Sequence, residues 1–126
     1  MRFVVTGGAG FVGSHLVKHL LKNDHDVIVI DNLHTGKKEN LGSVIDKIEF
    51  QELDIRNHES MKNILKNIDG VFHQAALTVV QDSFSNPKEY HDVNVQGTEN
   101  IFRLSIENKF KVVYASSSSV YGHKQK

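Results

Sequence analysis

The stretch that decides the fold is residues 3–13, which read Phe3-Val4-Val5-Thr6-Gly7-Gly8-Ala9-Gly10-Phe11-Val12-Gly13. It joins an apolar strand to a glycine-rich turn, and a helical pattern begins immediately behind the glycines. Gly7 can adopt the positive φ of a tight turn, Gly10 leaves room for an anion beside the backbone, and Gly13 lets the helix pack close to the strand. The first amides of such a helix point at bound phosphate. The residues therefore predict a phosphate-binding loop made of Gly7, Gly10, Phe11, Val12 and Gly13.

The rest of the chain alternates between strand-like and helix-like stretches. This order predicts an α/β fold, a doubly wound parallel sheet covered by helices on both faces. The apolar spacing predicts a first helix over 11–22, and the uninterrupted β-branched run 27–30 predicts a central strand buried on both faces. Further elements are expected as an edge strand at 48–53, a helix around 61–68, strands at 70–73 and 111–115, and a long helix over 86–108.

The long helix carries two local signals. Asn86 is a good N-cap, Pro87 suits the first helical position, and Glu89 completes the spacing of a capping box. Gly97 inside the helix indicates the close approach of another backbone.

Composition excludes several classes of function. With 126 residues the chain is expected to form one domain over 1–126, and its 15 basic and 15 acidic residues cancel. No basic stripe interleaved with aromatics is present, which argues against nucleic acid or anionic membrane as a partner. The absence of cysteine excludes disulfides and thiolate chemistry, and the absence of a signal peptide or long apolar segment favours a cytoplasmic protein.

Eight histidines invite a metal interpretation, which the spacing does not support. His15 and His19 lie at i, i+4, but no third ligand has a suitable spacing, so no metal is expected. His73 ends a buried strand and is predicted to be a hydrogen-bonded core histidine rather than a base.

Polar and small residues follow each predicted strand, where ligands bind in open parallel sheets. Asp31 lies 24 positions after Gly7, the distance at which a carboxylate accepts bonds from the ribose hydroxyls of a dinucleotide. A ribose 2′-phosphate would place like charges together, so Asp31 predicts NAD rather than NADP. The alternative is an aspartate that only caps a turn.

Two further segments are candidates for the same ligand. Asp54 is predicted to accept the exocyclic amine of adenine while Ile55 covers the ring, or the two residues simply end a strand. Gln74, Ala75 and Ala76 are predicted to lie against the nicotinamide or its ribose, although alanine is equally common in cores.

Several motifs together resemble the extended short-chain dehydrogenase/reductase family, in its branch of nucleotide-sugar epimerases and dehydratases. The matching segments are 6–17, 31–36, 53–56, 73–76, a pattern in the long helix that includes Asn94, and 114–122. The resemblance implies a Rossmann fold with strand order 3-2-1-4-5, NAD as cofactor, and cofactor contacts that extend to Asn32, Thr35, Gly36 and Asn94. It also implies a catalytic serine, and its position four residues before Tyr121 identifies Ser117.

The resemblance also implies parts that these residues do not contain. Family members carry a Tyr-x-x-x-Lys pair and a carboxyl-terminal lobe that grips the nucleotide sugar. Here Gln125 stands four positions after Tyr121, with Lys124 and Lys126 out of register, so Tyr121 is not expected to be the catalytic tyrosine. The expected function is the NAD-binding portion of a UDP-sugar 4-epimerase, truncated after strand five and inactive by itself, with UDP-sugar bound only in a longer form.

Two alternatives remain open. One is a stand-alone NAD-binding module with a sensing or scaffolding role, and the other is a nucleotide-sugar dehydratase or reductase relative. Truncation after strand five would leave an uncovered apolar edge, which is expected to favour self-association or a homodimer. The face of the long helix that carries Asn94 and Gly97 could make that contact, or it could pack on its own sheet.

Overall fold

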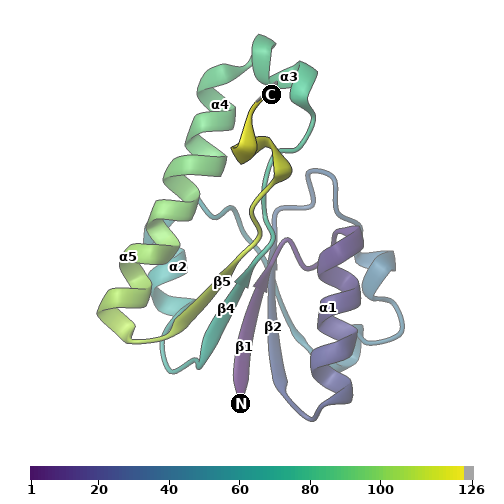
Figure 1. Cartoon of the computed structure of the whole chain (residues 1–126). Coiled ribbons are helices and arrows are strands. Elements are labelled where there is room, and N and C mark those ends of the chain that lie inside the picture. Colours follow the sequence, from purple (N-terminus) through teal and green to yellow (C-terminus); the bar gives the residue numbers. More distant parts are fainter. Residues whose placement is uncertain (124–126) are drawn as a thin grey trace.

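The computed structural model describes residues 1–123, in which five strands form one parallel sheet (Figure 1). The strands are β1 (Arg2–Thr6), β2 (Asp26–Asp31), β3 (Glu49–Glu52), β4 (Gly70–His73) and β5 (Lys111–Tyr114). Their order is β3-β2-β1-β4-β5, which confirms the predicted fold class and strand order. Lys124, Gln125 and Lys126, on which the argument about Tyr121 depends, lie outside the described residues.

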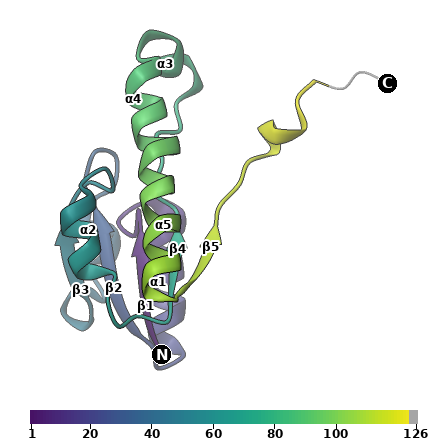
Figure 2. The ribbon, with the colours of Figure 1, turned by 90° about the vertical axis from the view of Figure 1, so that its left-hand side faces the viewer.

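The helices lie on both faces of this sheet, as predicted (Figure 1). They are α1 (Phe11–Lys22), α2 (His58–Ile64), α3 (Val80–Ser85), α4 (Pro87–His91) and α5 (Thr98–Asn108), with short 3₁₀ segments η1 (Lys38–Leu41), η2 (Ile45–Lys47) and η4 (Ser118–Tyr121). A π-helical segment, η3 (Asp92–Gly97), joins α4 to α5, so the three form one long rod (Figure 2). The bounds of α1 agree with the prediction, whereas α2 ends earlier than predicted.

Two apolar layers hold the helices to the sheet. The alternation of side chains along each strand sends neighbouring residues to opposite faces. One layer packs the sheet against α2 and α5, and the other packs it against α1. The first includes Val4, Ile28, Ile30, Ile101 and Leu104, and the second includes Val5, Val27, Val29, Val17 and Leu20. The burial of 27–30 on both faces is therefore confirmed.

The long rod differs from the sequence prediction in two details. Asn86 precedes α4 without a side-chain cap bond, so the predicted capping box is not formed. A Cβ added at Gly97 would lie 2.7 Å from the Ile55 Cδ1 atom and 2.8 Å from Cγ1. The close approach at Gly97 thus comes from a buried side chain and not from a backbone.

The inner face of the rod packs on its own molecule. Gly97 is buried, and the Asn94 side chain bonds to the backbone of Leu77, so this face is not available for self-association. The outward side chains Phe102 and Ile106 are 42% and 79% exposed. Beyond β5 the chain leads away from the sheet (Figure 2), and self-association through uncovered apolar surface stays a prediction.

Residues 1–123 contain no helix whose length and apolar character would let it cross a membrane.

His73 is the buried histidine of the sheet, as predicted. It ends β4 with 2% exposure, and its two ring nitrogens contact the Thr6 and Thr98 hydroxyls at 2.6 and 2.8 Å. Burial lowers the pKa of His73 from 6.5 to about 4, because the charged ring would lose its hydration.

This pKa predicts a stability that decreases as the pH is lowered. Between pH 6.5 and 4 the unfolded chain protonates His73 while the folded chain does not, so protons favour unfolding. The free energy of unfolding should be about 2 kcal/mol lower at about pH 5 than at about pH 7, as measured by urea denaturation. Asp54 and Asp92, whose pKa values are lowered from 3.8 by partners Arg56 and Lys88, lose stabilisation only at lower pH.

A His19→Gln variant is the matched control, because His19 lies on the exposed side of α1. Its unfolding free energy should retain the same pH dependence. A free energy of unfolding that does not change between the two pH values would contradict a neutral, buried His73.

Candidate cofactor-binding cleft

A cavity of about 750 Å³ opens beyond the carboxyl ends of the strands. It receives residues from the segments that follow all five strands. Every site residue predicted from the sequence lines it: Gly7, Gly10, Phe11, Val12, Gly13, Asp31, Asn32, Thr35, Gly36, Asp54, Ile55, Gln74, Ala75, Ala76, Asn94 and Ser117. The sheet therefore brings these residues together, while their contact with a cofactor stays a prediction.

Close backbone contacts set the shape of the glycine loop at Gly7 and Gly13. Gly7 has φ +68° and donates its amide to the Ile30 carbonyl at 2.8 Å, which ties the turn to β2. A Cβ at Gly7 would lie 2.8 Å from the Ala75 amide nitrogen, and a Cβ at Gly13 would overlap the Gly7 carbonyl oxygen. A Cβ at Gly10 would meet only the Gly7 oxygen within 4 Å, at 3.2 Å. The loop therefore leaves no room for a side chain at Gly7 or Gly13, whereas it leaves space beside Gly10.

The amino terminus of α1 fits an anion. Within residues 1–123 it has no side-chain cap bond, and its first turn contains no acidic residue. Phe11 and Val12 begin the helix with 79% and 61% of their surfaces exposed, and both line the cavity. The positive end of the helix thus faces a space where a diphosphate can accept amide hydrogen bonds. This is the arrangement that the pyrophosphate of a dinucleotide requires.

Asp31 stands at the carboxyl end of β2 and is only 8% exposed. Its Oδ2 atom accepts a hydrogen bond from the Ala9 amide at 3.0 Å, and its Oδ1 atom accepts one from the Leu33 amide at 2.8 Å. The carboxylate therefore shapes both the glycine loop and the following turn. Each oxygen retains capacity for another donor, so a turn-capping role and a ribose-binding role are compatible.

The segment after Asp31 is hydrogen-bonded to the glycine loop through the Ala9 carbonyl group. The Ala9 oxygen accepts from the Lys37 amide at 3.0 Å and from the Asn40 side chain at 2.8 Å. A Cβ at Gly36 would lie 2.9 Å from Asp31 Oδ2, so this segment also lies tightly against the carboxylate. Sequence reasoning missed Asn40, because no local pattern relates it to a loop 31 positions earlier.

Asp54 already has a strong partner. Arg56 donates to it from Nε at 3.0 Å, from Nη2 at 2.7 Å and from its own amide at 2.9 Å. The side-chain hydrogen bonds of Arg56 lower the pKa of Asp54 from 3.8. Ile55 is 3% exposed and packs against Gly97, so most of its side chain belongs to the core. If Asp54 and Ile55 contact adenine as predicted, they do so in addition to these structural roles.

Asn94 holds the wall of the cavity beside β4. Its Oδ1 atom accepts from the Leu77 amide at 2.8 Å, and its Nδ2 atom donates to the Leu77 carbonyl at 2.9 Å. These two hydrogen bonds resemble those between paired strands, and they join residues 17 positions apart in the sequence. Tyr90 donates its hydroxyl to the Val79 carbonyl at 2.6 Å and fastens the next part of the same segment.

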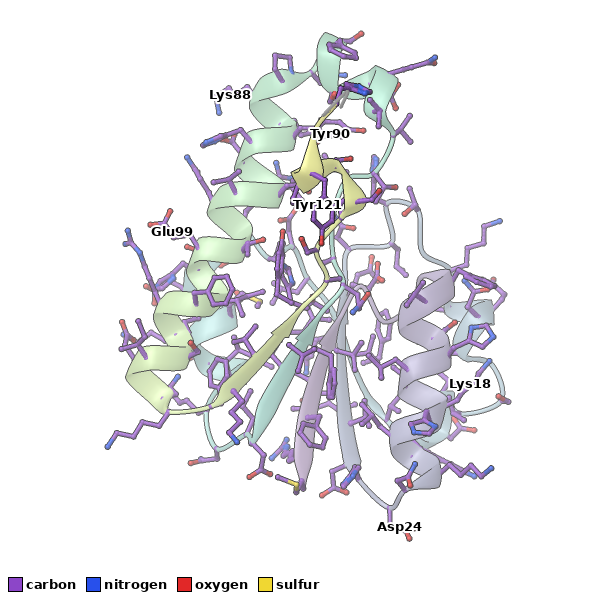
Figure 3. All side chains as sticks on the ribbon, viewed as in Figure 1. Lys18, Asp24, Lys88, Tyr90, Glu99 and Tyr121 are labelled. Carbon is purple, nitrogen blue, oxygen red and sulfur yellow. The ribbon has the colours of Figure 1, made fainter. Side chains whose placement is uncertain are left out.

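The segment after β5 presents hydroxyl groups. Ser117 is exposed, and its Oγ atom accepts from the Ser119 amide at 3.2 Å. Figure 3 shows Tyr121 and Tyr90 near the end of the molecule where the strands end, whereas Asp24 lies at the opposite end. Tyr121 is 80% exposed and does not contribute to the lining of the cavity. The described residues place no group of three or more acidic or histidine side chains where a metal ion could be held.

The cavity also takes residues that the sequence interpretation did not assign to a site. Among them are residues after β4, at the end of β5 and after β5: Leu77, Thr78, Val80, Tyr114, Ala115, Ser116 and Val120. Their position at two strand ends could have identified them, and segment 114–122, which carries part of the family resemblance, contains four of them. The lining of apolar and hydroxyl groups fits a ligand larger than the dinucleotide phosphates alone.

Comparison with known proteins gives one consistent family. Residues 3–126 match the NAD dependent epimerase/dehydratase family. A UDP-glucose 4-epimerase from Lacticaseibacillus casei is 38% identical over 127 residues, covering 97% of this chain and 37% of that protein. The UDP-glucose 4-epimerase of Thermotoga maritima, solved with UDP-glucose, superposes with a TM-score of 0.93 at 38% identity, covering 100% of this chain and 41% of that one.

A structure with a different named activity is also similar. DesIV, a dTDP-glucose 4,6-dehydratase from Streptomyces venezuelae solved with NAD, superposes with a TM-score of 0.92 at 34% identity, covering 100% of this chain and 42% of that one. This chain thus spans about two-fifths of the length of such relatives. Through its matched residues, its sheet order and its glycine loop, the chain belongs to the NAD dependent epimerase/dehydratase family.

Proposed function

We propose that this chain is the NAD-binding portion of a UDP-sugar 4-epimerase. The observation that carries the proposal is the convergence of five strand ends on one cavity beside the uncapped amino terminus of α1. The UDP-glucose 4-epimerase relatives support the choice of an epimerase. The dehydratase neighbour supports a nucleotide-sugar dehydratase as the second candidate.

Each part of the cavity has a role in this proposal. The amides of Phe11 and Val12 hold the pyrophosphate, which Gly10 allows to approach, and Asp31 accepts the ribose hydroxyls. Ala75 and Ala76 form a small-residue wall beside the nicotinamide. When bound, NAD supplies a position that takes up a hydride from a sugar carbon and returns it.

Ser117 is the chain's own candidate for the reacting sugar. Its exposed hydroxyl lies after β5 on the cavity wall and can hydrogen-bond a sugar hydroxyl. The serine orients this hydroxyl, and a general base must take the proton. These 126 residues contain no Tyr-x-x-x-Lys pair, because the three tyrosines are followed four positions later by Asn94, Ser118 and Gln125. We therefore assign cofactor binding to this chain and complete turnover to a longer form.

Substitution of Gly10 tests the phosphate site. A methyl group at Gly10 would contact only the Gly7 oxygen at 3.2 Å, so Gly10→Ala should fold but crowd the pyrophosphate. We expect its NAD affinity, measured by calorimetry, to fall by about tenfold or more, with little change in the urea midpoint.

Gly13→Ala is the matched comparison. Its methyl group would overlap the Gly7 carbonyl oxygen inside the loop, so both the urea midpoint and NAD affinity should fall. Gly10→Ala with unchanged NAD affinity would place the diphosphate elsewhere.

The dinucleotide preference tests the role of Asp31. The buried carboxylate repels a ribose 2′-phosphate, so the purified chain should bind NAD at least about tenfold more tightly than NADP in parallel titrations. Equal affinities would refute this role of Asp31, and binding of neither would refute the cofactor proposal.

The assignment of turnover to a longer form is tested with the 126-residue chain and UDP-galactose. With NAD present, conversion to UDP-glucose should stay below detection, because a general base typically contributes about 10²- to 10⁴-fold. A longer form that carries a downstream Tyr-x-x-x-Lys pair should convert the sugar, and Ser117→Ala should slow it. Turnover by the 126-residue chain would contradict the assignment, and an active longer form that eliminates water from a nucleotide sugar would favour the dehydratase.

A further inference from the structure

His73 lies between two threonine hydroxyls at the point where β1, β4 and α5 meet. Its Nδ1 atom is 2.6 Å from Thr6 Oγ1, and its Nε2 atom is 2.8 Å from Thr98 Oγ1. All three side chains are buried. Either ring nitrogen of a neutral histidine can carry the proton, so the partners decide which one does.

The Thr6 hydroxyl has no free lone pair for a ring N–H. Its oxygen accepts from the Ala75 amide at 3.2 Å and from the Gln74 amide at 3.1 Å, a donor that it shares with the Thr6 carbonyl oxygen, also at 3.1 Å. A hydroxyl offers one donor and two acceptor sites. Because the two amides fill the acceptor sites, the Thr6 proton must point to Nδ1 of His73, and Nδ1 must accept.

The Thr98 hydroxyl determines the protonation of the other ring nitrogen, Nε2. It donates its proton to the Asn94 carbonyl at 2.7 Å, which leaves its oxygen to accept. The Nε2 atom of His73 must therefore carry the proton and donate it to Thr98. Both partners require the same tautomer, and all donors point in one direction.

We propose that His73 is a positioning residue of the cofactor cleft, held neutral with its proton on Nε2 by a one-directional hydrogen-bond chain from the Gln74 and Ala75 amides to the Asn94 carbonyl. Only the expected effect of His73 on NAD binding rests on the proposed function. The tautomer itself follows from the protein alone.

This chain of hydrogen bonds joins two walls of the cavity. At one end, Thr6 sets the amides of Gln74 and Ala75, which line the cavity after β4. At the other end, Thr98 bonds to Asn94 in the π-helical segment, and the Asn94 side chain holds Leu77. A π-helical segment within a long helix is frequent at functional sites.

Protonation of His73 would disrupt this chain of hydrogen bonds. A second N–H on Nδ1 would face the Thr6 oxygen, whose acceptor sites are filled by the two amides. The titratable group against the ring is Tyr114 of β5, stacked at 5.9 Å, and His73 takes part in none of the ion pairs found within residues 1–123. Burial lowers the pKa of His73 to about 4, which agrees with a ring that stays neutral.

Long-range proton–nitrogen NMR of the labelled 126-residue chain tests the tautomer directly. We expect His73 to show a protonated Nε2 and an unprotonated Nδ1, unchanged from about pH 8 to about pH 5.5, through the ordinary pKa of histidine. A proton on Nδ1, or a doubly protonated ring at the lower pH, would overturn the proposal.

Substitutions at Thr98 test the effect on the cleft. Thr98→Val removes the acceptor for Nε2 while Thr6 still donates to Nδ1, so we expect the tautomer of His73 to persist but its Nε2 proton signal to shift, and NAD affinity to fall by about tenfold. Thr98→Ser keeps the hydroxyl and should retain both the signal and the affinity of the original chain, even if the valine variant does not fold. Loss of the Nε2 signal in Thr98→Ser, or unchanged NAD affinity in folded Thr98→Val, would overturn the proposal.

Ser105→Ala is the matched control. Ser105 also lies on α5 and donates to a backbone carbonyl, that of Phe102 at 2.6 Å, without contacting His73. It should change neither the His73 signal nor NAD affinity. If the original chain binds no NAD, the proposed function fails, while the NMR result still decides the assignment of His73.

Discussion

The glycine loop packs against its surroundings at distances that exclude side chains, and the cleft depends on this contact. Gly7 lies against the Ala75 amide of the β4 turn, and Gly13 lies against the Gly7 carbonyl. These contacts let α1 begin directly beside the end of β1, at the place where the strand order reverses. The helix amides and the β4 turn therefore face the same cavity.

Asp31 links the loop to the rest of the site. One carboxylate oxygen holds the Ala9 amide and the other holds the Leu33 amide, so the same residue orders the glycine loop and the turn after β2. The Ala9 carbonyl then fixes the segment that ends at Asn40. The acidic residue that is proposed to recognise the ribose is thus also part of the framework around it.

The sequence predicted those features that depend on local spacing. The apolar repeat gave α1 its correct bounds, and the β-branched run identified β2 as buried on both faces. The predicted site residues all line one cavity, because parallel strands bring their carboxyl ends to one edge. The π-helical turn, the Asn94 clamp on Leu77 and the Asn40 contact with Ala9 were not predicted. The two contacts depend on partners far away in the sequence, which no local pattern indicates.

By itself, the sequence determined the type and order of the elements and the glycine-rich turn after β1, because propensity, periodicity and glycine geometry act over a few residues. The tertiary structure decided how these parts bind one another. At Gly97 a side chain and not a backbone made the close approach, and at His73 two threonines from different elements contact the two ring nitrogens. Such choices are made by buried polar groups, which must find all their partners in three dimensions when water is excluded.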